Sequence, residues 1–251
     1  MLVPDKRVRP PGRAAPAVAV THRGPRDLLA DLRAGGVSDP GVLAAFEAVD
    51  RADFVPAELR AHAYEDRPLP IGDGQTISQP LIVGLMIQAL ELQRTDRVLE
   101  VGTGSGYATA LLAELAAEVY SIENRASLAA SAADRLRSLG YLETANVGAG
   151  CRRGVLHLAL GDGSVGWAQG ALFDAIMVSA TGPHLPEPLL AQLGPSGRLV
   201  MPVGTDRQRQ RLVRVGRGPD GLCEEADLGW VRFVPLLGQA GWPDRAETQP
   251  L

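Results

Sequence analysis

Apolar and polar residues follow one pattern before the sequence RVLEV and another after it. Before it, the segments 26–34 and 39–49 place apolar residues at helical spacing and predict two helices. Proline and glycine interrupt residues 51–74, which predicts an ordered loop with about one helical turn. The polar stretch QTISQP then precedes a long apolar run, so we expect a helix from Ser78, as its N-cap, to about Leu92.

From RVLEV onward, short β-branched runs alternate with helical segments. The expected strands cover residues 97–101, 119–123, 155–160, 173–180 and 198–204, and the helices between them cover 108–117, 125–139 and 186–193. Such alternation is typical of βαβ units, in which parallel strands are joined by right-handed crossovers. Near the end, RLVRVG and a segment ending in GWVRFVP flank the turn sequence GPDG and predict an antiparallel hairpin. We therefore predict an α/β fold: a single doubly wound, Rossmann-like domain with a mostly parallel sheet, N-terminal helices and a C-terminal antiparallel hairpin.

Composition narrows the class of protein. Of 251 residues, 45% are hydrophobic and 22% are charged, which allows a sizeable core and argues against a disordered chain. The net charge of −4 argues against a nucleic-acid-binding surface, which is usually basic. No apolar run reaches the ~20 residues of a membrane span, and Cys151 and Cys223 lack the spacing of a metal site. We expect a cytoplasmic protein with no metal, no nucleic-acid partner and no membrane partner.

A glycine-rich turn, EVGTGSG at 100–106, lies between a predicted strand and a predicted helix. Glycine there allows a tight turn and a close approach of the backbone to a ligand. A dinucleotide-binding loop needs the spacing G-x-G-x-x-G, but Tyr107 stands at the third glycine position, which argues against a nicotinamide dehydrogenase. No G-K-[ST] follows, so the turn is not a P-loop.

Two carboxylates lie at the carboxyl ends of the next two predicted strands: Glu123 ends the second strand and Asp162 follows the third. Glu123 is placed to accept hydrogen bonds from ribose hydroxyls, and Asp162, in a Gly-Asp-Gly turn, could accept from an adenine amino group. Because the carboxyl ends of parallel strands meet at one edge of a sheet, both would face one crevice. A nucleoside without a pyrophosphate fits such a crevice, and S-adenosyl-L-methionine is the obvious candidate.

The sequence VLEVGTGSGY resembles the first motif of class I S-adenosylmethionine-dependent methyltransferases. Further stretches resemble the protein-L-isoaspartate O-methyltransferase family over residues 27–238, and they are FVPAELRAHAYEDRPLPIGDGQTISQP, LGDGSVGW, FDAIMVSAT, LGPSGRLVMPVG and VRFVPL. The glycine motif is generic, whereas PLPIGDGQTISQP is much more specific to this family. The resemblance implies methylation of the free carboxylate of L-isoaspartyl residues in damaged proteins or peptides, and repair through a succinimide. It places Ser78 beside both cofactor and substrate, and makes VRFVPL a wall of the substrate site.

The expected site residues fall into three groups. We expect Ser78 and Thr76 to act on the reacting carboxylate. The expected cofactor-binding residues are Gln75, Thr76, Ser78, Glu100, Gly102, Thr103, Gly104, Ser105, Gly106, Glu123, Asn124, Gly161, Asp162 and Gly163. The expected substrate-binding residues are Ile77, Ser78, Val231, Phe233, Val234, Pro235 and Leu236. Tyr64 and Asp66 either line the substrate cleft or pack within their loop.

The resemblance also divides the chain into parts. We expect a disordered tail at 1–20, N-terminal helices and a substrate loop at 21–96, the S-adenosylmethionine-binding core at 97–238 and a loosely ordered tail at 239–251. Three stretches depart from the family pattern: the tail, a long link at 142–154, and SATGP at 179–183, where an alanine-rich turn is common.

Three questions stay open at this point. Related enzymes methylate an ordinary aspartate of a ribosomally made peptide and so form an aspartimide, and this substrate is the alternative to isoaspartyl repair. A protein that binds the cofactor without catalysis is a second alternative. The oligomeric state is open, with a monomer favoured.

Overall fold

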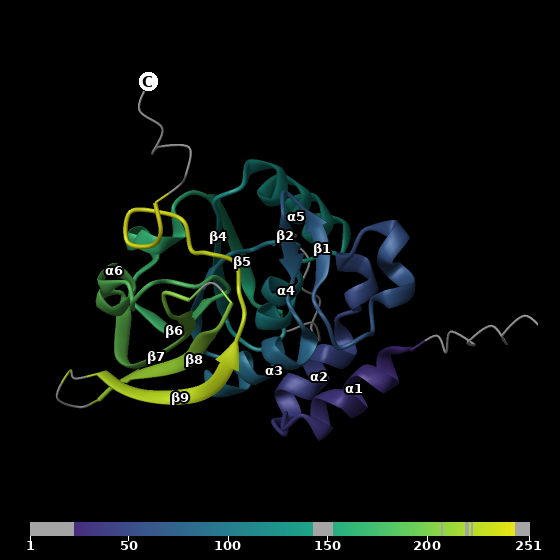
Figure 1. Ribbon diagram of the computed structural model, residues 1–251, viewed down its shortest axis with the longest axis horizontal. Helices are drawn as coiled ribbons and strands as arrows, with labels where there is room; N and C mark the ends of the chain where they lie inside the picture. The colour runs from purple at the N-terminus through teal and green to yellow at the C-terminus, as the bar shows by residue number, and fades with distance from the viewer. Residues whose placement is uncertain (1–22, 143–152, 207, 219–220, 222, 244–251) are drawn as a thin grey trace, which may run out of the picture.

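The computed structural model describes residues 23–142, 153–206, 208–218, 221 and 223–243 (Figure 1). The tail at 1–20, most of the link at 142–154, the centre of the GPDG turn and residues 244–251 lie outside the described residues, so the expectations for these stretches stay predictions.

A seven-stranded sheet forms the centre of the protein. Its strands are β3 (Arg97–Val101), β4 (Glu118–Glu123), β5 (Val155–Leu160), β6 (Phe173–Val178), β7 (Leu193–Val203), β8 (Gln210–Arg217) and β9 (Cys223–Val231). Their order is β5-β4-β3-β6-β7-β8-β9, with β3 to β7 parallel and with β8 and β9 antiparallel. The chain moves outward from β3 to β5 and returns to β6 on the other side of β3, so the connections diverge at a switch point between β3 and β6. The predicted doubly wound sheet with its C-terminal hairpin is confirmed.

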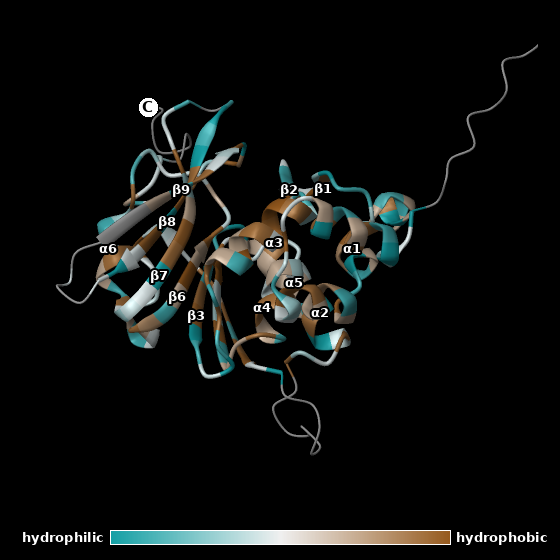
Figure 2. Ribbon diagram, turned by 90° about the horizontal axis from the view of Figure 1, so that it is seen from below, coloured by the Kyte–Doolittle hydropathy of each residue, from teal (hydrophilic) through white to brown (hydrophobic). Residues whose placement is uncertain are grey.

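Helices cover both faces of this sheet (Figure 2). They are α1 (Pro25–Ala34), α2 (Pro40–Ala48), α3 (Pro80–Ala89), α4 (Tyr107–Ala113), α5 (Ala126–Ser138) and α6 (Glu187–Ala191). Helices α1 to α5 gather on one face, and α6 lies on the other. Side chains alternate along a strand, so Val98 enters the cluster on the α1–α5 face and Leu99 the cluster on the α6 face, and both are fully buried.

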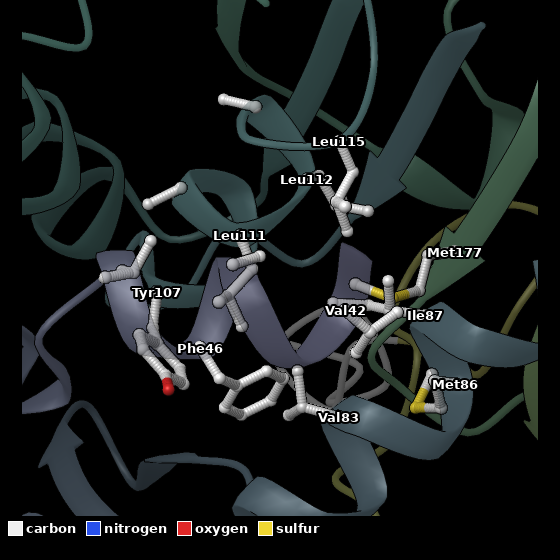
Figure 3. Close-up of a cluster of buried hydrophobic side chains, with 14 of the residues drawn as sticks. Val42, Phe46, Val83, Met86, Ile87, Tyr107, Leu111, Leu112, Leu115 and Met177 are labelled. Atoms are coloured by element: carbon white, nitrogen blue, oxygen red, sulfur yellow. The ribbon is translucent and has the colours of Figure 1, made fainter. Parts of the chain in front are cut away.

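The N-terminal helices share a hydrophobic cluster with the sheet. Figure 3 shows Phe46 of α2, Val83 of α3, Leu111 of α4 and Met177 of β6 within this cluster. Phe46 meets Tyr107 edge-on, with ring centroids 6.0 Å apart. Residues ahead of β3 are therefore packed directly onto the strands that carry the glycine turn.

The segment between α2 and α3 is more regular than the predicted loop. It contains two 3₁₀ helices, η1 (Arg51–Phe54) and η2 (Ala57–His62), and an antiparallel hairpin of β1 (Leu69–Gly72) and β2 (Gln75–Ile77). Asp73 and Gly74 form the hairpin turn with φ of 50° and 68°, the sign that two-residue hairpin turns favour. The residues Gln75 to Ile77 are thus a strand and lie outside the helix that follows.

The expected N-cap at Ser78 is wrong. Helix α3 begins at Pro80, in the first turn as expected, but its N-cap is Gln79. Asp66, 15 residues upstream, supplies the capping carboxylate: its Oδ1 accepts from the Leu81 N–H at 2.9 Å, and its Oδ2 accepts from Gln79 Nε2 at 2.8 Å. The Asp66 carboxylate thus contacts the start of α3 rather than packing only within its own loop.

Element ends differ elsewhere by a few residues. Helix α3 ends at Ala89 rather than near Leu92, and β6 ends at Val178 rather than at residue 180. Strand β7 begins at Leu193 rather than residue 198, because the turn LGPSG continues into the ladder with β6 through a bulge.

The start of the C-terminal tail is held in place, contrary to the loose attachment expected from residue 239. The Trp242 N–H donates to the Leu236 carbonyl at 2.7 Å, and the Gln239 N–H donates to Asp162 Oδ2 at 2.8 Å. Within the described ranges, no helix combines the length and hydropathy needed to cross a membrane.

Candidate active site

The glycine turn after β3 places backbone groups at the switch point of the sheet. Gly102, Gly104 and Gly106 all have positive φ, at 96°, 55° and 88°. Gly106 is the N-cap of α4, and a Cβ atom built on it would lie 3.2 Å from Leu136 of α5. The positive φ at position 106 favours glycine, and a side chain there would also press on Leu136.

Glu100 supports the glycine turn from beneath. The side chain is fully buried, and its Oε2 accepts from Thr109 Oγ1 at 2.5 Å and from Ser121 Oγ at 2.6 Å. Since the one hydroxyl proton of Ser121 goes to Glu100, Thr103 of the glycine turn donates to Ser121, at 2.6 Å. Burial raises the pKa of the Glu100 carboxyl to about 7. The hydrogen bonds from Ser121 and Thr109 oppose this rise, and the charge of Glu123 adds to it.

Glu123, at the end of β4, holds the glycine turn from the side. Its Oε2 accepts from the Gly104 N–H at 2.8 Å, and its Oε1 accepts from the Arg125 N–H at 3.0 Å. Each carboxylate oxygen has a second lone pair, and the residue lines the pocket described next. Glu123, which the sequence placed at the end of a strand, therefore lines this pocket, and two N–H groups hold its carboxylate in a fixed orientation.

The first of two adjoining cavities, which we call the donor pocket, encloses about 820 Å³ of space that is partly open to solvent. Ten of the predicted cofactor-binding residues line it, namely Gln75, Thr76, Ser78, Gly102, Thr103, Gly104, Ser105, Glu123, Asn124 and Gly163. Ile71 of β1 and Leu128 of α5 add apolar walls, and Ser127 of α5 donates to Asp73, which ties the hairpin turn to α5 across the pocket.

Four predicted cofactor-binding residues are not among those that line the donor pocket. Glu100 belongs to β3 and Gly106 is the N-cap of α4, at the two ends of the glycine turn, and Gly161 and Asp162 follow β5. The Asp162 carboxylate binds the chain itself, since Oδ1 accepts from the Ser164 N–H and hydroxyl at 2.8 and 2.6 Å while Oδ2 accepts from residue 239. An adenine contact by this carboxylate stays a prediction.

The second cavity, which we call the substrate groove, is more than twice as large, at about 1940 Å³. Strand β9 and the segment after it line one side, including Val231, Phe233, Val234 and Pro235 as predicted. The predicted substrate residues Ile77 and Leu236 line the donor pocket instead.

Hydrogen bonds to Thr181 and Gln210 hold in place the segment after β9 that lines the substrate groove. Thr181 donates its N–H to the Val234 carbonyl and accepts from the Leu236 N–H, both at 2.8 Å, and the Phe233 N–H donates to Gln210 Oε1 at 2.9 Å.

The donor pocket and the substrate groove meet at five residues that line both. These are Thr76, Ser78, Ser179, Val234 and Pro235. Thr76 and Ser78 were predicted from the sequence, and within the described residues the Ser78 hydroxyl makes no hydrogen bond, so it is free to face a ligand. Ser179 was missed because the predicted fourth strand, 173–180, included it, whereas β6 ends at Val178 and leaves Ser179 at the same edge as the glycine turn.

This arrangement has a defined chemical capability. A nucleoside-sized donor and an extended acceptor would approach each other at a junction lined by hydroxyl groups. Among the described residues, no three His, Cys, Asp or Glu side chains are grouped to hold a metal ion.

The chain resembles proteins of one family in sequence and in structure. Residues 23–241 match the family described as protein-L-isoaspartate(D-aspartate) O-methyltransferase. Protein-L-isoaspartate O-methyltransferase 1 of Rhodopseudomonas palustris (strain HaA2) is 52% identical over 213 residues, which are 84% of this chain and 81% of the relative. A protein-L-isoaspartate O-methyltransferase of Anaeromyxobacter dehalogenans (strain 2CP-C) is 54% identical over 201 residues, or 80% of this chain and 91% of the relative.

A solved structure from Plasmodium falciparum agrees with this result. It is described as a putative protein-L-isoaspartate O-methyltransferase in complex with S-adenosyl-L-homocysteine, and it superposes with a TM-score of 0.73 at 26% identity, over 86% of this chain and 99% of that one. The resemblance inferred from the sequence motifs is confirmed. The chain belongs to the protein-L-isoaspartate(D-aspartate) O-methyltransferase family.

Proposed function

We propose that this protein transfers the methyl group of S-adenosyl-L-methionine to the free carboxylate of L-isoaspartyl residues in damaged proteins or peptides, which starts repair through a succinimide. The observation that carries the proposal is the meeting of the donor pocket and the substrate groove at Thr76, Ser78 and Ser179. The names of relatives about 50% identical to this chain support the substrate, and the S-adenosyl-L-homocysteine in the Plasmodium falciparum structure supports the donor.

The residues of the donor pocket fit S-adenosyl-L-methionine. The glycine turn brings backbone groups close to the ligand, the lone pairs of Glu123 suit ribose hydroxyls, and Ile71 and Leu128 supply apolar contact. When bound, the sulfonium supplies an electrophilic methyl group.

The reaction requires positioning rather than a base. A carboxylate with a reference pKa of about 3.9 is ionised at neutral pH, so no proton has to be removed before it attacks. A carboxylate oxygen forms a bond to the methyl carbon as the sulfur–carbon bond breaks, and the bonding pair stays on sulfur. Alignment of the two reactants can lower such a barrier by roughly 7–11 kcal/mol.

The hydroxyls of Ser78 and Thr76 are the groups that we expect to hold the carboxylate. The N-terminus of a helix can also hold an anion, but the Leu81 N–H of α3 is already bound by Asp66. Side-chain hydroxyls donate to the carboxylate without neutralising it, so the anion is oriented and remains a nucleophile. This assignment makes Ser78 a binding group whose loss affects turnover more than folding.

The test is methyl incorporation from labelled S-adenosyl-L-methionine into an isoaspartyl peptide and into its aspartyl twin of identical sequence. We expect methylation of the isoaspartyl peptide alone. Equal or reversed preference would refute repair and favour the peptide-tailoring reaction, and donor binding with no turnover on either peptide would indicate a binding protein. Ser78→Ala should lower turnover, whereas Glu123→Gln should lower donor affinity, measured by calorimetry. A cytoplasmic location and a monomeric state remain our predictions.

A further inference from the structure

Arg51 is the most deeply buried charged group near the substrate groove. It lies at the start of η1, and only 1% of its surface is exposed. Nη1 donates to the carbonyl of Ala63 at 2.6 Å and to that of Glu65 at 3.3 Å. Nη2 donates to the carbonyl of Arg67 at 3.1 Å and to that of Ser78 at 3.0 Å. One guanidinium therefore joins the backbone of residues 63–67 to the backbone of Ser78.

This guanidinium remains charged despite its burial. Desolvation lowers its pKa to about 10, while nearby Tyr107 and Asp66 oppose that shift. Burying a cation without an ion-pair partner is costly unless polar groups surround it, and here four carbonyl oxygens do so. The planar fork of arginine can reach four carbonyls at once, which the single ammonium of lysine cannot do.

Arg51 affects Ser78, at the junction of the two cavities, both directly through the Ser78 carbonyl and through residues 63–67. Residues 63–67 include Asp66, whose carboxylate binds Gln79 and Leu81 just after Ser78. The backbone of Ser78 is thus held at its own carbonyl by Arg51, and the chain directly after it is held by Asp66. Within the described residues, no hydrogen bond reaches the Ser78 side chain, so its orientation depends on the backbone that carries it.

We propose that Arg51 is a positioning residue for methyl transfer, which acts by holding Ser78 so that its hydroxyl faces the junction of the donor pocket and the substrate groove. This inference rests on the proposed function. It assigns Arg51 no contact with either reactant. A displacement of about 1 Å in a positioning group can cost about 100-fold in rate, so the expected effect falls on the methyl-transfer step.

The experiment compares Arg51→Lys, Ser78→Ala and the double variant in kcat and KM for an isoaspartyl peptide. We expect Arg51→Lys to lower kcat about 100-fold, with little change in the affinity for S-adenosyl-L-homocysteine measured by calorimetry. Because Arg51 acts through Ser78, Arg51→Lys should add less than about threefold to the loss already caused by Ser78→Ala, which is the non-additivity expected of coupled residues.

Arg198→Lys is the matched control. Arg198 also donates to backbone carbonyls, those of Leu90 and Glu91 at 2.8 and 2.9 Å, but it does so at the other end of α3. It should lower stability without lowering kcat. Equal loss of kcat in this control, or full additivity of Arg51→Lys with Ser78→Ala, would overturn the proposal.

Arg51→Gln, which keeps two N–H donors without the charge, is the second variant. Normal kcat in either folded variant would refute the positioning role. If Arg51→Lys and Arg51→Gln both lose cooperative unfolding and donor binding, Arg51 is only structural. That result would also overturn the proposal. Wild-type protein that does not methylate the isoaspartyl peptide would instead refute the proposed function.

Discussion

Glu100 should make the stability of the folded protein decrease as pH rises toward neutrality. Its pKa is raised from 4.5 to about 7, first because the carboxyl is buried. The unfolded chain therefore releases this proton at lower pH than the folded protein. The stabilisation is complete below pH 4.5, is lost as pH rises to about 7, and changes little above that value. A shift of about 2.5 pH units at about 1.4 kcal/mol per unit corresponds to about 3.5 kcal/mol over the whole titration.

The substitution Glu100→Gln should remove this dependence. The amide cannot ionise, and its oxygen still accepts from Thr109 or Ser121. Urea unfolding of both proteins between pH 5 and pH 8 measures the effect, since subtracting the two curves cancels all other titrating groups. We expect the free energy of unfolding of the wild type to fall by about 2.5 kcal/mol relative to the variant across this range, because part of the stabilisation is already lost at pH 5.

A control separates burial from the loss of a negative charge. Glu58 is exposed in η2, and Glu58→Gln should keep the wild-type pH profile. Parallel profiles for the wild type and Glu100→Gln would show that Glu100 does not change its ionisation in this range, and the reasoning from burial would be wrong.

Three further predictions follow from the site. Asp66→Ala should lower the free energy of unfolding by about 1 kcal/mol, as expected for a lost helix cap. Ser78→Ala should lower the free energy of unfolding by under about 0.5 kcal/mol but should lower turnover. A larger loss of stability for Ser78→Ala than for Asp66→Ala in urea unfolding would contradict this. Gly106→Ala should cost about 1–2 kcal/mol because its φ of 88° disfavours a Cβ atom, which would also press on Leu136, and unchanged thermal unfolding would disprove it. S-adenosyl-L-homocysteine at about 100 times its Kd should stabilise the protein by about 2.7 kcal/mol, and at the same concentration it should stabilise Glu123→Gln less; equal thermal shifts would remove Glu123 from the donor site.

Local patterns in the sequence were sufficient for the sheet and for the glycine turn and Glu123 of the donor pocket, whereas Thr76 and Ser78 were expected at the site from the family resemblance. Alternation of β-branched runs with helical segments reflects which residues face the core, and a glycine turn after a strand requires φ values that glycine supplies. Glu123 could be found because the carboxyl ends of parallel strands always meet at one edge. All three signals lie within a few residues of the feature that they predict.

Tertiary contacts decided the role of each polar side chain in the site. The sequence made Ser78 a helix cap, but Asp66 caps α3 from 15 residues away, and Arg51 holds the Ser78 carbonyl from 27 residues away. Asp162 also follows a parallel strand, yet the N–H of residue 239, far along the chain, engages its carboxylate. Hydrogen-bonding capacity belongs to the residue and can be read from the sequence, whereas the partner that uses it depends on which distant backbone groups folding brings within about 3 Å.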